Sequence, residues 1–137
     1  NSITPVKNLD CVISYNSNGV NYSATLKSFG GGIVEIEMLS PTTLKGLKYS
    51  YDNGKGELSF LGLKVPIEKI DSGIFKEIAV AALNIYKGNL PAIKQKEGYT
   101  VNLNGITLKF DDEGFVTSLE VNDILVNFEH KNRLIKN

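Results

Sequence analysis

Alternation of apolar and polar residues covers most of this chain and predicts a protein built mainly of β-strands. Apolar side chains occupy every second position in residues 9–15, and the same pattern returns in residues 20–26 and 34–38. A period of two places all apolar side chains of a strand on one face. Asn-Ser-Asn-Gly at residues 16–19 is typical of the turn between two such strands. The first third of the chain is therefore expected to form a meander of three strands.

The middle of the chain predicts further strands before any helix begins. Pro41 bars a continuous central strand and is expected to start a new element. Alternation in residues 44–51 predicts a strand that turns through a glycine-containing hairpin into residues 57–61. We expect Gly62 to bend this second strand, because the alternation resumes in residues 63–67.

The last third repeats the meander. Apolar and polar residues alternate in residues 99–103, 106–110, 115–121 and 124–128, with Asn-Gly and acidic turn signals between them. The polar tail at residues 131–137 is expected to fray.

Ser72–Gly88 is the one segment with the period of an α-helix. Asp71 or Ser72 can cap its start, and Gly88 can supply the left-handed residue that ends it. Two neighbouring rows of apolar residues recur at helical spacing: Ile74, Ile78, Ala81, Ala82 and Ile85, and beside them Phe75, Ala79, Leu83 and Tyr86. An apolar surface this wide must pack against something, and the concave face of the sheet is the available partner. The predicted fold is a single mainly β (α+β) domain over residues 1–137, with about nine antiparallel strands and one central helix.

Composition and charge narrow the possible functions. The chain has 137 residues, with 15 Lys and Arg against 15 Asp and Glu, so no overall field attracts nucleic acid or an anionic membrane. A single cysteine excludes an intrachain disulfide. No apolar run reaches the length of a membrane span. The start at Asn1 has neither an initiator methionine nor a signal peptide, and we expect it to be a mature or trimmed end.

Few residues are candidates for catalysis or metal binding, and they are isolated from one another in the sequence. His130 is the one histidine, and we interpret it as solvent-facing near a frayed end rather than as an acid, base or metal ligand. Cys11 lies on an apolar strand face and is expected to act as a small buried hydrophobe. The acidic cluster at residues 111–114 lacks the ligand spacing of a calcium loop and is interpreted as a turn. The expectation is therefore no enzyme activity, no catalytic residue, no metal site and no cofactor.

Aromatic and aliphatic residues in the middle of the chain leave two interpretations open. They can simply pack as core, or they can line an apolar cavity between the sheet and the helix that holds an acyl chain. The residues proposed to line such a cavity are Tyr49, Phe60, Leu63, Phe75, Ile78 and Tyr86.

The segment Leu39–Ile67, LSPTTLKGLKYSYDNGKGELSFLGLKVPI, resembles small envelope lipoproteins of spore-forming, Gram-positive bacteria. Those lipoproteins are similar to the lipoprotein-carrier (LolA/LolB-like) family, whose fold is an open antiparallel half-barrel with helices across its mouth. The motifs that carry the resemblance are a proline-led SP-x-x-L-K-G-L strand, a glycine hairpin and an L-x-F-L-G-L stretch before the helix.

The resemblance implies an extracytoplasmic domain anchored to the membrane by a lipidated cysteine upstream of Asn1. Cys11 is not that cysteine, because Asn8, Leu9 and Asp10 do not match the small apolar residues that precede a lipidation site. The leading functional hypothesis is a non-enzymatic domain that binds a protein partner, for which some similar lipoproteins suggest a cell-wall enzyme. The alternative is a carrier for a lipid or another apolar ligand, and the oligomeric state is left open.

The open edges of a half-barrel are expected to bind an additional strand, from a partner or from a second copy of the chain. Strand order cannot be read from the sequence. Glu35, Glu37 and Pro41 are the residues expected to protect an edge if one of them lies there.

Overall fold

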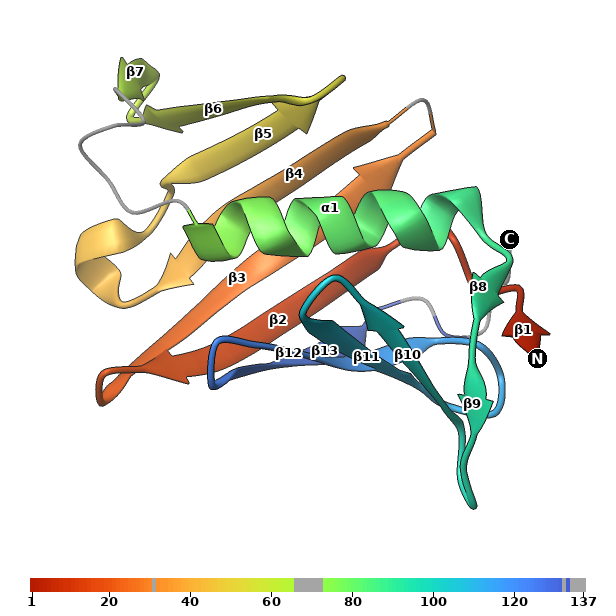
Figure 1. Ribbon diagram of the computed structural model, residues 1–137. Coiled ribbons are helices and arrows are strands. Elements are labelled where there is room, and N and C mark those ends of the chain that lie inside the picture. Colours follow the sequence, from red (N-terminus) through yellow and green to blue (C-terminus); the bar gives the residue numbers. More distant parts are fainter. Residues whose placement is uncertain (31, 66–72, 132, 134–137) are drawn as a thin grey trace.

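A curved antiparallel sheet that does not close, with one helix across its concave face, makes up this molecule (Figure 1). The computed structural model describes residues 1–30, 32–65, 73–131 and 133. This architecture confirms the predicted mainly β fold with a single central helix.

Eleven strands form the large sheet, and two short strands pair separately. The strands in chain order are β1 (Ser2–Ile3), β2 (Asp10–Ser17), β3 (Val20–Phe29), β4 (Ile33–Ser40), β5 (Lys48–Asp52), β6 (Lys55–Phe60), β7 (Leu63–Val65), β8 (Leu90–Pro91), β9 (Ile93–Lys94), β10 (Tyr99–Leu103), β11 (Ile106–Phe110), β12 (Val116–Val121) and β13 (Ile124–His130). The two-residue strands were not predicted, because two residues are too few to show an alternation.

The strand order explains how the chain builds an open sheet. The order is β7-β6-β5-β4-β3-β2-β13-β12-β11-β10-β9, so the first long strand and the last pair in the middle. From β2 the chain runs outward by consecutive hairpins to β7, then crosses through helix α1 (Gly73–Lys87) to the other edge, and returns inward to β13. Helix α1 is therefore the connection between the two free edges.

Helix α1 covers the sheet with the residues that its sequence pattern predicted. Its buried residues come from both apolar rows: Phe75, Ile78, Ala79, Ala81, Ala82 and Ile85. The small alanines bring the helix close to β3, β4 and β5, the strands that it contacts. Gly88 follows with a φ of 74° and donates its N–H to the carbonyls of Asn84 and Ile85, as expected for a left-handed cap. The predicted N-cap residues, 71 and 72, lie outside the described residues.

Two local predictions in the middle of the chain are wrong. Residues 44–47 are not strand: Thr42–Leu44 form a short 3₁₀ helix, η1, after a cis peptide bond at Pro41, and Gly46 has a φ of 91°. Gly62 does not bend a strand but forms a complete hairpin turn between β6 and β7. In both places a glycine with positive φ reverses the chain where alternation alone suggested continuity.

Two described residues of the C-terminal tail make contacts with the rest of the domain, and the other residues of the tail that was predicted to fray lie outside the described residues. Lys131 donates its backbone N–H to the carbonyl of Asp10, and the guanidinium of Arg133 binds the carboxylate of Asp111. The pairing of β13 with β2 brings this end of the chain to the centre of the sheet, which the sequence could not reveal.

The helix should be essential for stability. Ile78 is fully buried beneath it, whereas Lys76 is exposed on its outer side. Ile78→Ala should lower the free energy of unfolding by about 2–5 kcal/mol, and Lys76→Ala should leave it nearly unchanged. Urea denaturation of both variants measures this difference; equal, negligible effects would show that the helix is not packed as described.

Candidate functional site

The six residues proposed to line a cavity are divided between the core and the surface of the described structure. Tyr49, Phe75 and Ile78 are buried in the core between helix and sheet, and the rings of Tyr49 and Phe75 lie 5.6 Å apart. The Tyr49 ring occupies the space above Gly56 of β6, where an added Cβ would collide with the tyrosine hydroxyl.

The other three proposed residues lie elsewhere. Phe60 is half-buried against the core. Tyr86 is half-buried at the far end of the helix, beneath the ammonium group of Lys7. Leu63 is 73% exposed on β7. The structure thus separates these residues among the core, its margin and the open surface.

An apolar groove does exist, at the first turn of α1 rather than under its middle. Its volume is about 410 Å³. Its lining comes from the β2–β3 hairpin, β4, η1, the start of α1 and the β12–β13 hairpin: Tyr15, Ser17, Asn18, Tyr22, Met38, Leu44, Leu47, Ile74, Phe75 and Ile124. Phe75 is the one predicted residue among them. Sequence reasoning missed the others because only the pairing of distant hairpins brings them together.

The groove is electrically neutral as well as apolar. Its lining includes no Lys, Arg, Asp or Glu. The rings of Tyr15 and Tyr22 stack with 5.1 Å between their centroids, and burial raises the pKa of Tyr15 to about 12, so the phenol carries no charge near neutral pH. Such a lining can take an apolar group but offers no counter-ion for a charged one.

In the part of the sheet that the structure describes, the edge strands are β7 and β9. β4 lies between β3 and β5, so the expectation that Glu35, Glu37 or Pro41 protects an edge is wrong. Glu35 instead forms an ion pair with Lys48 on the neighbouring strand, at 3.2 Å.

The edge at β9 is protected by features that discourage strand addition. β9 has two residues, Ile93 and Lys94, and Pro91 closely precedes them. The ammonium group of Lys94 donates to the carbonyls of Gln95 and Gly98 and to the carboxylate of Asp112. A short strand, a proline and a lysine are common means of blocking an edge.

The edge at β7 is also short and carries a lysine, Lys64, but it exposes two leucines. Leu61 is 82% exposed at the tip of the β6–β7 hairpin, and Leu63 follows it on the edge strand. Figure 1 places this hairpin at the end of the sheet remote from β1 and Asn1. Exposed apolar side chains beside unpaired backbone groups are typical of a binding surface.

Leu61 also occupies an unfavourable backbone conformation. Its φ is 54°, in the left-handed region that asparagine and glycine tolerate better than leucine. Four other two-residue hairpin turns in the described chain place asparagine at the equivalent position: Asn18, Asn53, Asn104 and Asn122. Neither packing nor turn geometry accounts for the leucine, because its side chain is exposed and its conformation favours asparagine.

His130 is not solvent-facing, contrary to the prediction. It lies on the inner face of β13 opposite Cys11, half-buried against the ring of Phe115. Its Nε2 donates to the carbonyl of Val116 over 2.6 Å, which leaves Nδ1 to accept from the Cys11 thiol at 3.4 Å. The prediction failed because β13 ends in the middle of the sheet, where even the last residue is covered by its neighbours.

The Cys11–His130 pair is neutral. Burial raises the pKa of Cys11 to about 12, and burial lowers the pKa of His130 below its ordinary value of 6.5. The thiol is therefore protonated, and the cysteine is fully buried, as predicted. A reactive cysteine needs a thiolate that a substrate can reach, and the buried, protonated thiol of Cys11 has neither property.

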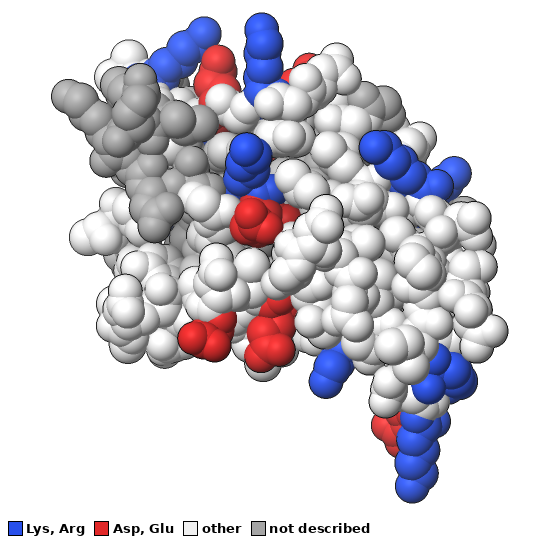
Figure 2. Space-filling view, in the orientation of Figure 1, with Lys and Arg blue, Asp and Glu red and all other residues white. Residues whose placement is uncertain are grey.

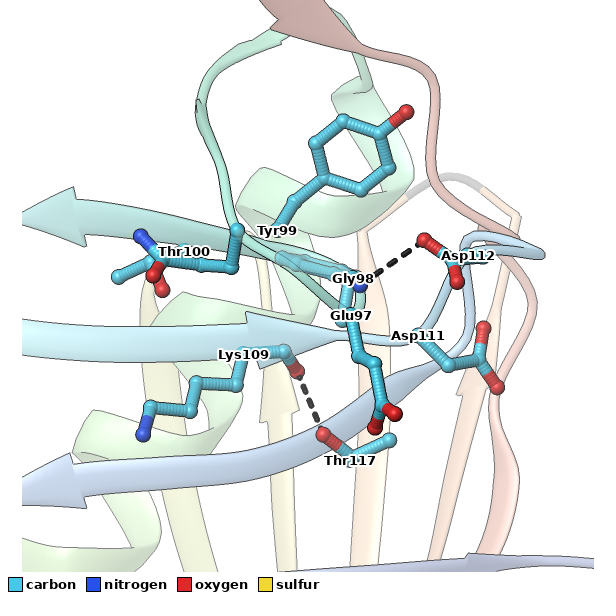
Figure 3. A pocket seen from close by; sticks show the side chains of 10 residues that line it. Glu97, Gly98, Tyr99, Thr100, Lys109, Asp111, Asp112 and Thr117 are labelled. Atoms are coloured by element: carbon cyan, nitrogen blue, oxygen red, sulfur yellow. Dashed lines mark hydrogen bonds between the residues drawn. The ribbon is translucent and has the colours of Figure 1, made fainter.

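The acidic turn at residues 111–114 is confirmed as a turn, and its carboxylates bind groups of the protein itself. Asp111 accepts the N–H groups of Glu113 and Phe115. Burial alone would raise the pKa of Asp111, but the hydrogen bonds from Arg133, Phe115 and Glu113 outweigh it and lower this pKa. Figure 3 shows Asp112 pointing at the backbone of Gly98, whose N–H it accepts over 2.8 Å. The pocket in Figure 3 lies where the turn before β10 meets the turn at residues 111–114.

Neither membrane crossing nor metal binding is indicated within the described residues. None of the described helices is long and apolar enough to cross a membrane. No three His, Cys, Asp or Glu side chains of the described chain gather where they could hold a metal ion. On the face that α1 occupies, charges of both signs are interspersed among broad neutral areas (Figure 2).

Comparison with known proteins gives no assignment. No protein-family model, no curated protein and no solved structure matches this chain.

Replacing Leu61 by asparagine should stabilise the domain. Asparagine tolerates the left-handed conformation, and the exposed leucine side chain loses little packing, so Leu61→Asn should raise the free energy of unfolding by about 1 kcal/mol. Thermal and urea denaturation measure the change. The matched control is Leu125→Asn, an exposed leucine of ordinary strand conformation, which should not stabilise; destabilisation by Leu61→Asn would mean that the leucine packs.

The His130 contacts should make stability fall in mild acid. The pKa of His130 is lower in the folded state than in the unfolded chain, so below about pH 6.5 the unfolded chain binds more protons and folding weakens. The free energy of unfolding should therefore decrease from pH 7 to pH 5, and His130→Gln should reduce this slope. Asp111 and Asp112, whose pKa values are lowered from 3.8, contribute their losses at lower pH. An unchanged slope in the variant would contradict the assignment.

Proposed function

We propose that this chain is a non-enzymatic binding domain of the cell envelope and that a protein partner docks on its free edge at β7. The observation that carries the proposal is Leu61: a strained and exposed leucine at the tip of an edge hairpin, where four comparable turns of the same chain have asparagine. A residue that costs stability without packing is expected where it serves an interaction.

The location of the hairpin fits this role. Both edges are short strands that carry a lysine, Lys94 on β9 and Lys64 on β7. They differ in their exposed apolar side chains, which are Leu61 (82%) and Leu63 (73%) at β7 and Ile93 (57%) at β9. The sequence resemblance supports an extracytoplasmic domain anchored through a lipidated cysteine upstream of Asn1, with a cell-wall enzyme as one class of partner. The β6–β7 hairpin lies away from Asn1, so a tether there leaves it accessible (Figure 1).

A second candidate function is the binding of an apolar ligand, such as an acyl chain. The specific observation in its favour is the neutral groove of about 410 Å³ at the first turn of α1. Its volume lies within the range of small-molecule sites. This groove lies at the first turn of α1, so the ligand would occupy that end of the half-barrel.

Photo-cross-linking distinguishes the two functions. A benzoylphenylalanine residue replaces Leu63 in one variant and Leu125, which is exposed on the outer face of β13, in a matched control. After irradiation with the envelope fraction of the source organism, we expect a discrete protein adduct at position 63 and none at position 125. Mass spectrometry identifies the adduct.

A third variant carries the cross-linker at Ile74, inside the groove. A lipid adduct at position 74 with no protein adduct at position 63 would replace the proposed function with the second candidate. Equal protein adducts at positions 63 and 125 would show contact without specificity and would contradict docking at β7.

A further inference from the structure

Lys64 is the residue that determines what can pair with the β7 edge. Phe60 pairs with Leu63 across the two-residue turn, and Leu58 pairs with Val65. The pair that closes such a hairpin exchanges both backbone hydrogen bonds, and hydrogen-bonded pairs alternate along an antiparallel ladder. Leu63 and Val65 therefore direct their N–H and C=O groups toward β6. Lys64 directs its N–H and C=O outward, so β7 offers an added strand one donor and one acceptor from one residue.

This register determines which residue of β7 lies beside each residue of an added strand. The partner residue that bonds to Lys64 lies directly opposite it, with its side chain on the same face of the sheet. The residues before and after it lie on the other face, beside Leu63 and Val65. Leu63 is exposed and Val65 is partly buried there, so apolar neighbours are favoured on that face.

The charge of Lys64 selects the residue of the added strand that lies directly opposite it. Its ammonium group lies 3.4 Å from the carboxylate of Glu57, but both side chains are mostly exposed, and such a surface pair is weak and easily exchanged. Directly opposite residues of like charge destabilise a strand pair, whereas opposite charges stabilise it. A second copy of this chain paired symmetrically about Lys64 would place two lysines against each other, so the register disfavours that dimer.

We propose, on the basis of the proposed function, that the partner presents an extended antiparallel segment with an Asp or Glu opposite Lys64 and an apolar residue on each side of it. Leu61 at the tip inserts into an adjoining apolar pocket of the same partner. The specificity of the edge thus comes from one charge and two leucines, because β7 is too short for backbone hydrogen bonds alone to select a partner.

A charge exchange tests this pairing with defined probes. Two capped synthetic peptides, Thr-Val-Glu-Val-Thr and Thr-Val-Lys-Val-Thr, are titrated into the isotope-labelled chain, and amide shifts of β7 report binding by NMR. Wild type should bind the Glu peptide at least fivefold more tightly than the Lys peptide. Lys64→Glu should reverse this preference, whereas Lys48→Glu, on the central strand β5, should leave it unchanged.

Each other outcome rejects this pairing. Equal binding of both peptides, or no binding, overturns the proposed register and charge selection; a protein adduct at position 63 would still support the proposed function in that case. A concentration-dependent dimer in sedimentation that Leu61→Asn abolishes would assign the edge to a second copy. Binding to phosphatidylglycerol vesicles that Leu61→Asn abolishes would assign the hairpin to a membrane surface.

Discussion

Coverage of the concave face by α1 is the constraint on which the rest of this structure depends. A sheet that does not close leaves its inner apolar side chains without the opposite wall that a barrel would supply. Here one helix takes that place, and its alanines let it approach the strands closely enough to bury Tyr49, Ile36 and Leu58. Without the helix, the apolar faces of β3, β4 and β5 would be open to water.

The same constraint creates both candidate surfaces. Because α1 is a single helix, it covers the middle of the sheet but leaves the neutral groove at its first turn. Because the sheet is open, it ends in two edge strands. Both edges are short and carry a lysine, and the β7 edge exposes the two leucines Leu61 and Leu63.

Three polar side chains near the core, Cys11, His130 and Asp111, make hydrogen bonds within the protein. The neutral pair of Cys11 and His130 satisfies its hydrogen bonds with itself and with the carbonyl of Val116. Asp111 holds its own turn and Arg133. Buried polar groups that are paired in this way stabilise a unique packing, which agrees with a domain that acts through its surface.

The sequence by itself determined the helix, most of the longer strands and which face of each is buried. Alternation in the strands and the apolar rows of residues 72–88 depend on local periodicity, and a buried face leaves that signal in the chain. It also determined that Cys11 is buried and that residues 111–114 form a turn. These features need no knowledge of distant partners.

Only the tertiary structure decided strand order, and with it every candidate surface. The pairing of β13 with β2 buried part of His130, and the central position of β4 removed Glu35 and Glu37 from any edge. The groove joins hairpins far apart in sequence, so no local pattern marks it. In the sequence, Leu61 is marked only by its position before Gly62. The structure shows that Leu61 has a positive φ, is exposed and lies beside an edge strand, whereas the four comparable turns have asparagine at this position. The sequence could not show this, because periodicity reflects which side chains are buried but not which strand lies at an edge.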